Sequence, residues 1–267
     1  MRAAVVGATG RIGRLVHRAL ERDHHEVVPV SRAHGIDALT GQGLDDALAD
    51  VDVVVDVTNT TVTDERAAEE FFRTTTEHLL TAERATGVKH HIVLSIAGVS
   101  RVRGNAHYAG KRAQEAAVVA GDVPWTIVPA TQFHDFAEMV ASWTEDNGVA
   151  LVPPLLVQPV APADVAEILA RVAVTGPQGR HVEVAGPERE DLVDMARRTF
   201  ATRGQEIQLV PSWHTGIFGV EMAGDALLPL DGAHIAPTSF DTWLAGISDA
   251  RADVAAGAAP PAGATTP

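Results

Sequence analysis

Three glycines near the start of the chain, Gly7, Gly10 and Gly13, lie between a predicted strand at residues 2–6 and a helix expected from Arg14. Glycines at this spacing let the backbone approach a diphosphate and let the helix pack closely against the sheet. The first N–H groups of such a helix, with their partial positive charge, bind phosphate oxygens. The alternative is a purely structural turn, but the strand before and the helix after favour nucleotide binding. The residues expected to bind the nucleotide here are Gly7, Thr9, Gly10, Arg11, Ile12 and Gly13.

The end of the second predicted strand, residues 27–30, bears on which dinucleotide is bound. An acidic side chain there binds the ribose 2′-hydroxyl of NAD, whereas an arginine accepts the 2′-phosphate of NADP. This chain has Ser31 and Arg32 and no acid, and Arg11 could add positive charge. We therefore expect NADP(H) over NAD(H), although Arg32 could also be a solvated loop charge. Asn59 follows the third strand and is expected near the adenine or the ribose.

Composition excludes several other classes of function. The chain has 267 residues, 46% of them hydrophobic, with a net charge of −14 and no cysteine. Acidity argues against nucleic acid and anionic membranes as partners, and the lack of cysteine excludes disulfides and thiolate zinc sites. The histidine pairs at residues 24–25 and 90–91 are interpreted as loop or strand-edge residues, so we predict no metal site. We expect a cytoplasmic protein with a small-molecule substrate, and a homodimer is possible.

The hydrophobic pattern predicts an α/β fold with two parts. Strand and helix patterns alternate over residues 1–130, which predicts a doubly wound, Rossmann-type parallel sheet that binds NAD(P). Proline-rich and glycine-rich turns then become frequent, and residues 131–250 are expected to form a smaller substrate lobe packed on the first part. Residues 251–267 have little charge and no periodicity, which predicts a disordered tail. The helices expected with defined ends are 64–86, 105–120, 161–174, 188–203 and 238–250.

These segments together resemble the short-chain dehydrogenase/reductase superfamily, and within it the atypical, NmrA-like NAD(P)-binding group. The resemblance rests on the glycine loop, the Ser31-Arg32 strand end, the strand that ends at Ser95 and the helix that carries Lys111. Further similar segments are 125–128, 131–136 and 159–166. It covers about residues 1–250 and implies a nicotinamide cofactor, but it does not identify a substrate.

In that superfamily a serine at a strand end polarises a carbonyl, a tyrosine donates a proton, and a lysine four residues later lowers the tyrosine pKa and holds the nicotinamide ribose. By this resemblance Ser95 takes the serine position and Lys111 the lysine position, where it would both assist catalysis and bind the cofactor. The structural alternatives are a serine with a structural role at a strand end and a surface lysine.

The tyrosine position departs from the family pattern. His107, not tyrosine, lies four residues before Lys111, and Tyr108, the single tyrosine of the chain, lies three before it. Tyr108 is the acid if the helix is turned, and His107 is competent if its pKa stays near 6.5. A third possibility is that neither acts. A nearby lysine charge favours a tyrosinate and opposes a protonated histidine, so we favour Tyr108.

Residues after the strand at 125–128 lie where ligands bind in open α/β sheets. They are expected to contact substrate and are Gln132, Phe133, His134 and Phe136, and the large apolar residues Trp143, Trp213, Phe218 and Met222 form either a pocket wall or lobe core. We expect an NADPH-dependent oxidoreductase that reduces a carbonyl, quinone or enone of a small apolar molecule, with a role in biosynthetic tailoring possible. The alternatives are a non-catalytic NADP-sensing protein and a redox-neutral isomerase or cyclase on the same fold.

Overall fold

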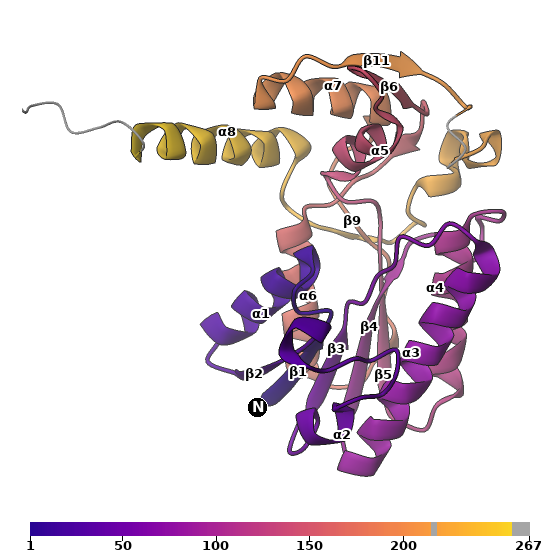
Figure 1. Cartoon of the computed structure of the whole chain (residues 1–267), viewed down its shortest axis with the longest axis vertical. Coiled ribbons are helices and arrows are strands. Elements are labelled where there is room, and N and C mark those ends of the chain that lie inside the picture. Colours follow the sequence, from indigo (N-terminus) through magenta and orange to yellow (C-terminus); the bar gives the residue numbers. More distant parts are fainter. Residues whose placement is uncertain (215–217, 258–267) are drawn as a thin grey trace, which may run out of the picture.

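A parallel β-sheet with helices on both faces organises the chain (Figure 1). The computed structural model describes residues 1–214 and 218–257. The strand order is β12-β9-β5-β4-β3-β1-β2, and β8 also pairs with β5. The strands of this sheet are β1 (Arg2–Val6), β2 (Glu26–Val30), β3 (Val53–Asp56), β4 (His90–Ile96), β5 (Trp125–Ala130), β8 (Gly179–Arg180), β9 (Val184–Ala185) and β12 (His234–Ile235). The predicted doubly wound, Rossmann-type α/β fold is confirmed.

Helices cover both faces of the sheet and the region above its carboxyl edge. Local capping sets several of their ends, because a side-chain oxygen satisfies N–H groups that a helix start leaves unpaired. Asp64, Asn105 and Asp191 each accept such a bond at the start of a helix, and Pro162 opens another. The helices are α1 (Arg11–Arg22), α2 (Leu44–Ala47), α3 (Glu65–Thr86), α4 (Ala106–Ala120), α5 (Phe136–Thr144), α6 (Pro162–Thr175), α7 (Leu192–Arg203) and α8 (Phe240–Gly257), with short 3-10 turns η1 (Arg32–His34), η2 (Val220–Met222) and η3 (Gly224–Leu227).

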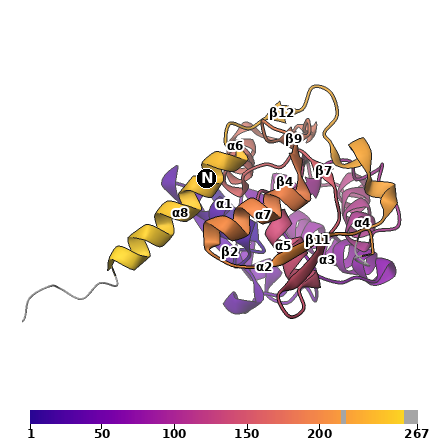
Figure 2. The ribbon, with the colours of Figure 1, turned by 90° about the horizontal axis from the view of Figure 1, so that it is seen from above.

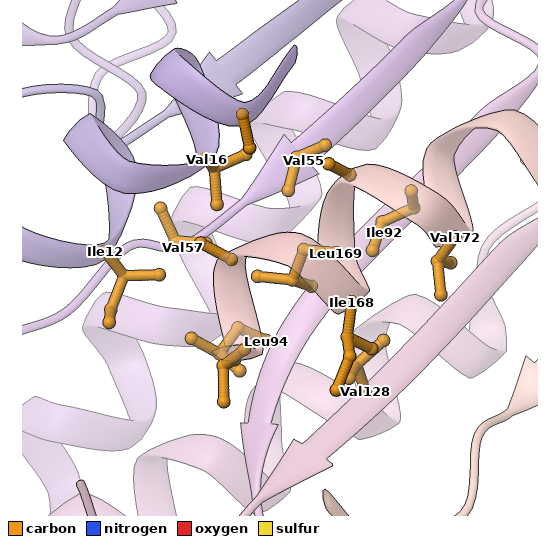
Figure 3. Close-up of a cluster of buried hydrophobic side chains, with 14 of the residues drawn as sticks. Ile12, Val16, Val55, Val57, Ile92, Leu94, Val128, Ile168, Leu169 and Val172 are labelled. Carbon is orange, nitrogen blue, oxygen red and sulfur yellow. The ribbon is translucent and has the colours of Figure 1, made fainter. Parts of the chain in front are cut away.

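The main core lies between the sheet and the pair α1 and α6. Figure 3 shows Val16 of α1 and Leu169 of α6 in one cluster with Val55 and Ile92, which come from neighbouring strands. On the opposite face, α2 and α3 bury Leu44 and other apolar side chains against β1 and β3. Continuous apolar strands are expected where both faces of a parallel sheet are covered.

The two histidines of β4 are buried, which corrects the expectation of edge or loop residues. His90 and His91 are 2% and 0% exposed. The Nδ1 atom of His91 lies 2.7 Å from Oε1 of Glu83, whose side chain is also fully buried. The carboxylate raises the pKa of His91 against the opposing effect of burial. This pair joins α3 to the centre of the sheet and is structural.

Elements on both sides of residue 130 contribute to the main sheet. After that point α6, β8, β9 and β12 still belong to the parallel sheet and its covering layer. The other later elements build a second core above the carboxyl edge, around α5 and α7 (Figure 1). Their strands pair in two small sheets, β10 (Glu190–Asp191) with β7 (Leu156–Val157) and β11 (Gln208–Pro211) with β6 (Val149–Val152).

Several element ends differ from the prediction for non-local reasons. The helix expected from residue 188 starts at Leu192, because Glu190–Asp191 pairs with β7 and Asp191 then caps the helix. Helix α8 continues to Gly257, past the expected start of the tail, and points away from the body (Figure 2). The rest of that predicted tail, 258–267, lies outside the described residues.

The strand order fixes where a ligand can enter. The chain passes from β1 out to β2 and then returns across β1 to β3, so the direction of winding reverses between β1 and β3. In open α/β sheets the crevice at the carboxyl ends of two such strands is the ligand site. Gly7 and Val57, which directly follow these two strands, flank that crevice. Within the described residues, no helix has the length and apolar character required to cross a bilayer.

We predict that Leu169→Ala lowers the free energy of unfolding by about 2–5 kcal/mol, because it removes apolar volume from a fully buried site between α6 and the sheet. Urea unfolding followed by circular dichroism measures the change. Leu230→Ala is the matched control, because Leu230 is 58% exposed and its truncation should change stability by less than about 0.5 kcal/mol. Equal losses in the two variants would contradict the placement of the core.

Candidate functional site

The glycine loop brings the end of β1 against the end of β3. Gly7 has a φ of +83°, and a Cβ built on it would lie 3.1 Å from the carbonyl oxygen of Val57. A Cβ on Gly13 would lie 2.2 Å from the carbonyl oxygen of Gly7, a distance that no side chain tolerates. The N–H of Gly10 donates to that same oxygen at 2.8 Å. The three glycines therefore permit a tight turn and a close contact between α1 and β1.

The start of α1 fits an anionic ligand. Gly10 is its N-cap and provides no side-chain acceptor, and no acidic residue lies in the first turn. Thr9, Gly10 and Arg11 are exposed, so the first N–H groups and an arginine surround a position where a diphosphate would bind. Ile12 is 8% exposed and its side chain packs in the main core, so it can offer a ligand its backbone N–H but not its side chain.

The end of β2 offers a second positive group. Arg32 is exposed, and in the described part of the chain no ion pair within 4.0 Å includes it. Ser31 lies beside it, and its Oγ is 2.7 Å from Nδ1 of His34 within η1. An arginine without a carboxylate partner, adjacent to a hydroxyl, fits a phosphate ester, and neither residue is the acidic side chain that binds the ribose 2′-hydroxyl of NAD.

Arg11 does not extend toward Arg32. Its guanidinium pairs with the carboxylate of Asp135 and lies over the ring of Phe133, 5.2 Å from the centroid. Both partners follow β5, on the other side of β1 from β2. This corrects the expectation that Arg11 assists Arg32 at the 2′-phosphate. In this conformation Arg11 connects the glycine loop with the loop that leads into α5.

Lys111 is buried beneath the crevice. Its Nζ donates to the carbonyl oxygen of Leu94 at 2.9 Å and to Oε1 of Gln114 at 2.8 Å, and lies 4.5 Å from the ring centroid of Phe72. A longer bond of 3.3 Å reaches the carbonyl oxygen of Thr58. Burial lowers the pKa of Lys111 to about 8. Lys111 is therefore an interior cation at the base of the site and not a surface lysine.

Asp56 and Asn59, which follow β3, have different surroundings. The carboxylate of Asp56 is fully buried and accepts bonds of 2.8 Å from the N–H of Thr58 and from Nε2 of Gln114. It therefore shapes the loop after β3. Asn59 is exposed, and its Oδ1 accepts a bond from the N–H of Thr60. Asn59 can still offer its amide nitrogen to a ligand.

Ser95 does not face the crevice. Its side chain lies between the sheet and α4, is 5% exposed, and donates a bond of 2.5 Å to Oε1 of Glu115. The other carboxylate oxygen of Glu115 pairs with Arg180. A hydroxyl that already donates its hydrogen to a buried carboxylate cannot polarise a substrate carbonyl by donation. The geometry thus agrees with the structural alternative for Ser95.

Tyr108 and Lys111 are less than one helical turn apart on α4 but contact different neighbours. Tyr108 is 3% exposed, packs with the second core, and its hydroxyl oxygen accepts a bond of 3.0 Å from Nε2 of Gln132. Burial raises the pKa of this hydroxyl well above its usual value, the opposite of the lowering expected from a neighbouring lysine. The tyrosine is therefore not activated by Lys111, which corrects the reason for favouring it as the acid.

His107 is the aromatic residue that Lys111 affects. Its ring lies 5.9 Å from that of Phe72, the ring over which Lys111 Nζ also lies. Burial, and then the lysine charge, lower the pKa of His107 to about 4. The imidazole is neutral at pH 7, so it can accept a hydrogen bond or a proton but has no proton of an imidazolium to donate. This corrects the expected pKa near 6.5.

The four residues expected to contact substrate point to different neighbours. Gln132 bonds Tyr108, and its Oε1 is buried without a partner in the described structure. Phe133 lies under Arg11, and Phe136 packs against Phe218 at 5.6 Å. His134 is 1% exposed, its ring lies 5.5 Å from that of Phe240 in α8, and its Nε2 lies 3.1 Å from the carbonyl oxygen of Thr238, just before that helix. Of the four, Gln132 and Phe133 stay nearest to the glycine loop and α4.

The large apolar residues of the later half belong mostly to lobe core. Phe218 and Met222 are 8% and 0% exposed, and Trp213 packs against the same cluster. Trp143 is 47% exposed. These positions favour the interpretation as core over that of a pocket wall.

Sequence reasoning assigned no role to three residues that determine the geometry of the site. Glu115 holds Ser95, Gln114 joins Asp56 to Lys111, and Asp135 holds Arg11. Glu115 lies four residues after Lys111, and helical spacing alone places the two on one face of α4. No local signal indicates Asp135, because its partner is far away in the sequence.

Comparison with known proteins agrees with this geometry. A family model described as NAD(P)H-binding matches residues 7–175. No curated relative matches the chain in sequence. The NADPH complex of the NADPH-dependent quinone oxidoreductase from Escherichia coli has a TM-score of 0.69 at 17% identity, over 92% of this chain and 99% of that one.

Two further solved structures have the same fold. The NADP complex of dTDP-4-dehydrorhamnose reductase from Bacillus anthracis has a TM-score of 0.69 at 15% identity, over 94% of this chain and 99% of that one. The NADP(H) complex of the Citrobacter triphenylmethane reductase has a TM-score of 0.60 at 18% identity, over 79% of each chain. At these identities the likeness is one of fold. Because the family model covers more than half of the chain, the protein belongs to the NAD(P)H-binding family, with the fold of the atypical short-chain dehydrogenase/reductases.

Proposed function

We propose that the protein is an NADPH-dependent oxidoreductase whose acceptor is a small conjugated molecule, a quinone or an enone, and not a simple ketone. The observation that carries this choice is the position of Tyr108. Its hydroxyl lies against Gln132, away from Lys111, and burial raises its pKa. The proton donor that a simple ketone requires is therefore not assembled.

A conjugated acceptor removes that requirement. The nicotinamide, when bound, supplies a hydride. Hydride addition to a simple ketone gives a localised alkoxide, which needs a proton as it forms. Addition to a quinone or an enone gives an anion delocalised over a ring or an enolate, which water can protonate afterwards. The overall reaction then consumes one hydride and one proton per acceptor, and this chain's residues need only bind and orient.

Residues around the crevice support binding and orientation. The glycine loop and the start of α1 bind the diphosphate, and Arg32 binds the 2′-phosphate. Lys111 places a positive charge beneath the crevice below about pH 8, where it favours anionic ligands. The quinone oxidoreductase and the triphenylmethane reductase that have this fold act on conjugated compounds according to their names, which supports the proposal.

A non-catalytic NADP-binding protein is the second candidate. The observation that favours it is that Ser95 and Tyr108 both donate or accept bonds within the protein interior. The two proposals differ in one expected outcome: a non-catalytic protein binds NADPH but shows no turnover with any acceptor.

Oxidation of NADPH, followed at the nicotinamide absorbance band with a panel of quinones, enones and simple ketones, tests the proposal. We expect turnover with the conjugated acceptors and a loss of less than about threefold in Tyr108→Phe, because the hydroxyl is not the proton donor. Lys111→Met should reduce kcat/KM by at least about tenfold. Activity restricted to simple ketones and abolished in Tyr108→Phe would disprove it, and tight NADPH binding without turnover would favour the second candidate.

Arg32→Ala should weaken NADPH binding by about tenfold to hundredfold, because a charge-assisted bond to the 2′-phosphate is lost. NADH, which lacks that phosphate, should lose no more than about twofold. Isothermal titration calorimetry with both cofactors measures the difference. Arg84→Ala is the control for overall charge, since Arg84 pairs with Asp122 at the far end of α3. Equal losses for the two cofactors would show that Arg32 does not contact the phosphate.

Lys111 should titrate near pH 8 in the folded protein. The chain has two lysines, and in protein labelled at lysine Cε the Lys89→Arg variant assigns both NMR signals. Because the folded pKa of Lys111 lies below the unfolded value of 10.5, the folded state binds fewer protons between these two pH values. This group therefore makes unfolding harder as pH rises from about 8 to 10.5, and Lys111→Met should reduce that rise. A Lys111 signal that titrates above pH 10 would contradict its burial.

A further inference from the structure

Asp135 occupies the first position before α5 but does not cap that helix. The structure shows no side-chain cap bond at this residue, whose backbone (φ −85°, ψ 3°) is not in the extended conformation of a typical N-cap. Aspartate is nevertheless a residue type that accepts from the first N–H groups of a helix. Its Oδ2 pairs instead with Arg11, and its Oδ1 is buried without a partner in the described structure. The carboxylate is 16% exposed. Asp135 thus binds the guanidinium of Arg11, which is far away in the sequence, while its side chain accepts no bond from the N–H groups at the start of α5.

Arg11 has an alternative partner of its own. It is the first residue of α1, the helix whose uncapped start and glycine loop fit a diphosphate. The guanidinium can bind a diphosphate through two parallel bonds, as it binds a carboxylate. Asp135 and the diphosphate therefore compete for one cation. If both stayed beside Arg11, two anions would lie close together in a partly buried place, which is unfavourable.

The pair also joins two parts of the molecule. Arg11 is the first residue of α1, directly after the glycine loop, while α5 packs its buried side chains Ala137, Val140 and Ala141 into the second core. Phe133, between them, lies under the guanidinium. A change of partner at Arg11 therefore alters the connection between the glycine loop and the second core.

We propose that the Arg11–Asp135 ion pair is a latch that opens when the dinucleotide binds: the guanidinium transfers from the Asp135 carboxylate to the diphosphate, and Asp135 then caps α5. The exchange involves no covalent step. Asp135 is in this way a residue that sets cofactor affinity without touching the cofactor. The inference rests on dinucleotide binding, which follows from the family, and does not depend on the reductase activity proposed above.

The test measures NADPH binding to Asp135→Asn by calorimetry. The amide keeps the size of the side chain and removes the competing charge, so NADPH should bind roughly threefold to tenfold tighter. Asp135→Glu, which keeps the charge, should show no tightening. Asp122→Asn is the matched control, because it removes an aspartate from an arginine pair at the far end of α3 and α4. Weaker or unchanged binding in Asp135→Asn would overturn the latch and leave Asp135 as a fixed support for Arg11.

A double-mutant cycle with Arg11→Gln separates the latch from simple repulsion between Asp135 and the cofactor. Arg11→Gln alone should weaken NADPH about tenfold. In that background the latch predicts no further effect of Asp135→Asn, since no cation is left to release. Tightening that persists there would show repulsion without a latch. Circular dichroism and the thermal midpoint establish that each variant is folded.

The fragment 2′-AMP locates the effect within the cofactor. It carries the adenine, the ribose and the 2′-phosphate but no diphosphate, so Asp135→Asn should leave its affinity unchanged. ADP-ribose, which carries the diphosphate, should bind tighter to the variant, as NADPH does. An equal gain for 2′-AMP and ADP-ribose would overturn the assignment of Arg11 to the diphosphate. Failure of turnover with every acceptor would leave these binding results unaffected.

Discussion

The close approach of the glycine loop to the end of β3 is the constraint on which the site depends. Gly13 allows α1 to touch the backbone of Gly7, and Gly7 in turn lies against Val57. A side chain at either glycine would separate α1 from the sheet or block the space between β1 and β3. Because α1 stays this close, its uncapped start lies directly above the point where the winding of the sheet reverses. Anion binding and core packing therefore rely on the same backbone contacts.

Positive charge around this crevice is placed at three depths. Arg32 is exposed at the rim, Arg11 is partly covered by Asp135 and Phe133, and Lys111 is buried at the base. Each depth changes what the charge can do. The exposed arginine is available to a ligand at once, the covered one must change partners, and the buried one acts through its field and through its effect on His107.

Local chemistry in the sequence was sufficient to predict much of the framework. The glycine loop and the starts of the helices expected from residues 64, 105 and 161 lie where the sequence indicates, because the loop, the caps at Asp64 and Asn105 and the proline that opens α6 each depend on residues a few positions apart. The directions of Ser95 and Tyr108 could not be predicted in this way. They depend on how α4 is rotated against the sheet and the second core, which is decided by packing between segments far apart in the chain.

Contacts between segments far apart in the chain also explain where the structure of residues 131–250 differs from the sequence prediction. The sequence predicts a helix start at residue 188, but residues 190–191 form β10 and pair with β7. A boundary near residue 130 also does not account for β8, β9 and β12, which belong to the main sheet. An interpretation based on spacing alone also treats Tyr108 and Lys111 as one unit. The structure shows that a step of three along α4 places them in different environments, one against Gln132 and the other against Phe72.

The position of α6 has a consequence for synthesis of the protein. The apolar side of α1 is covered by α6, which follows much later in the chain, and β12 joins the sheet later still. During translation the nascent chain therefore exposes this surface until α6 has left the ribosome, and the sheet gains its last edge strand only near the end of synthesis. Truncation before that point should leave this apolar surface uncovered, so the product should aggregate or stay bound to chaperones.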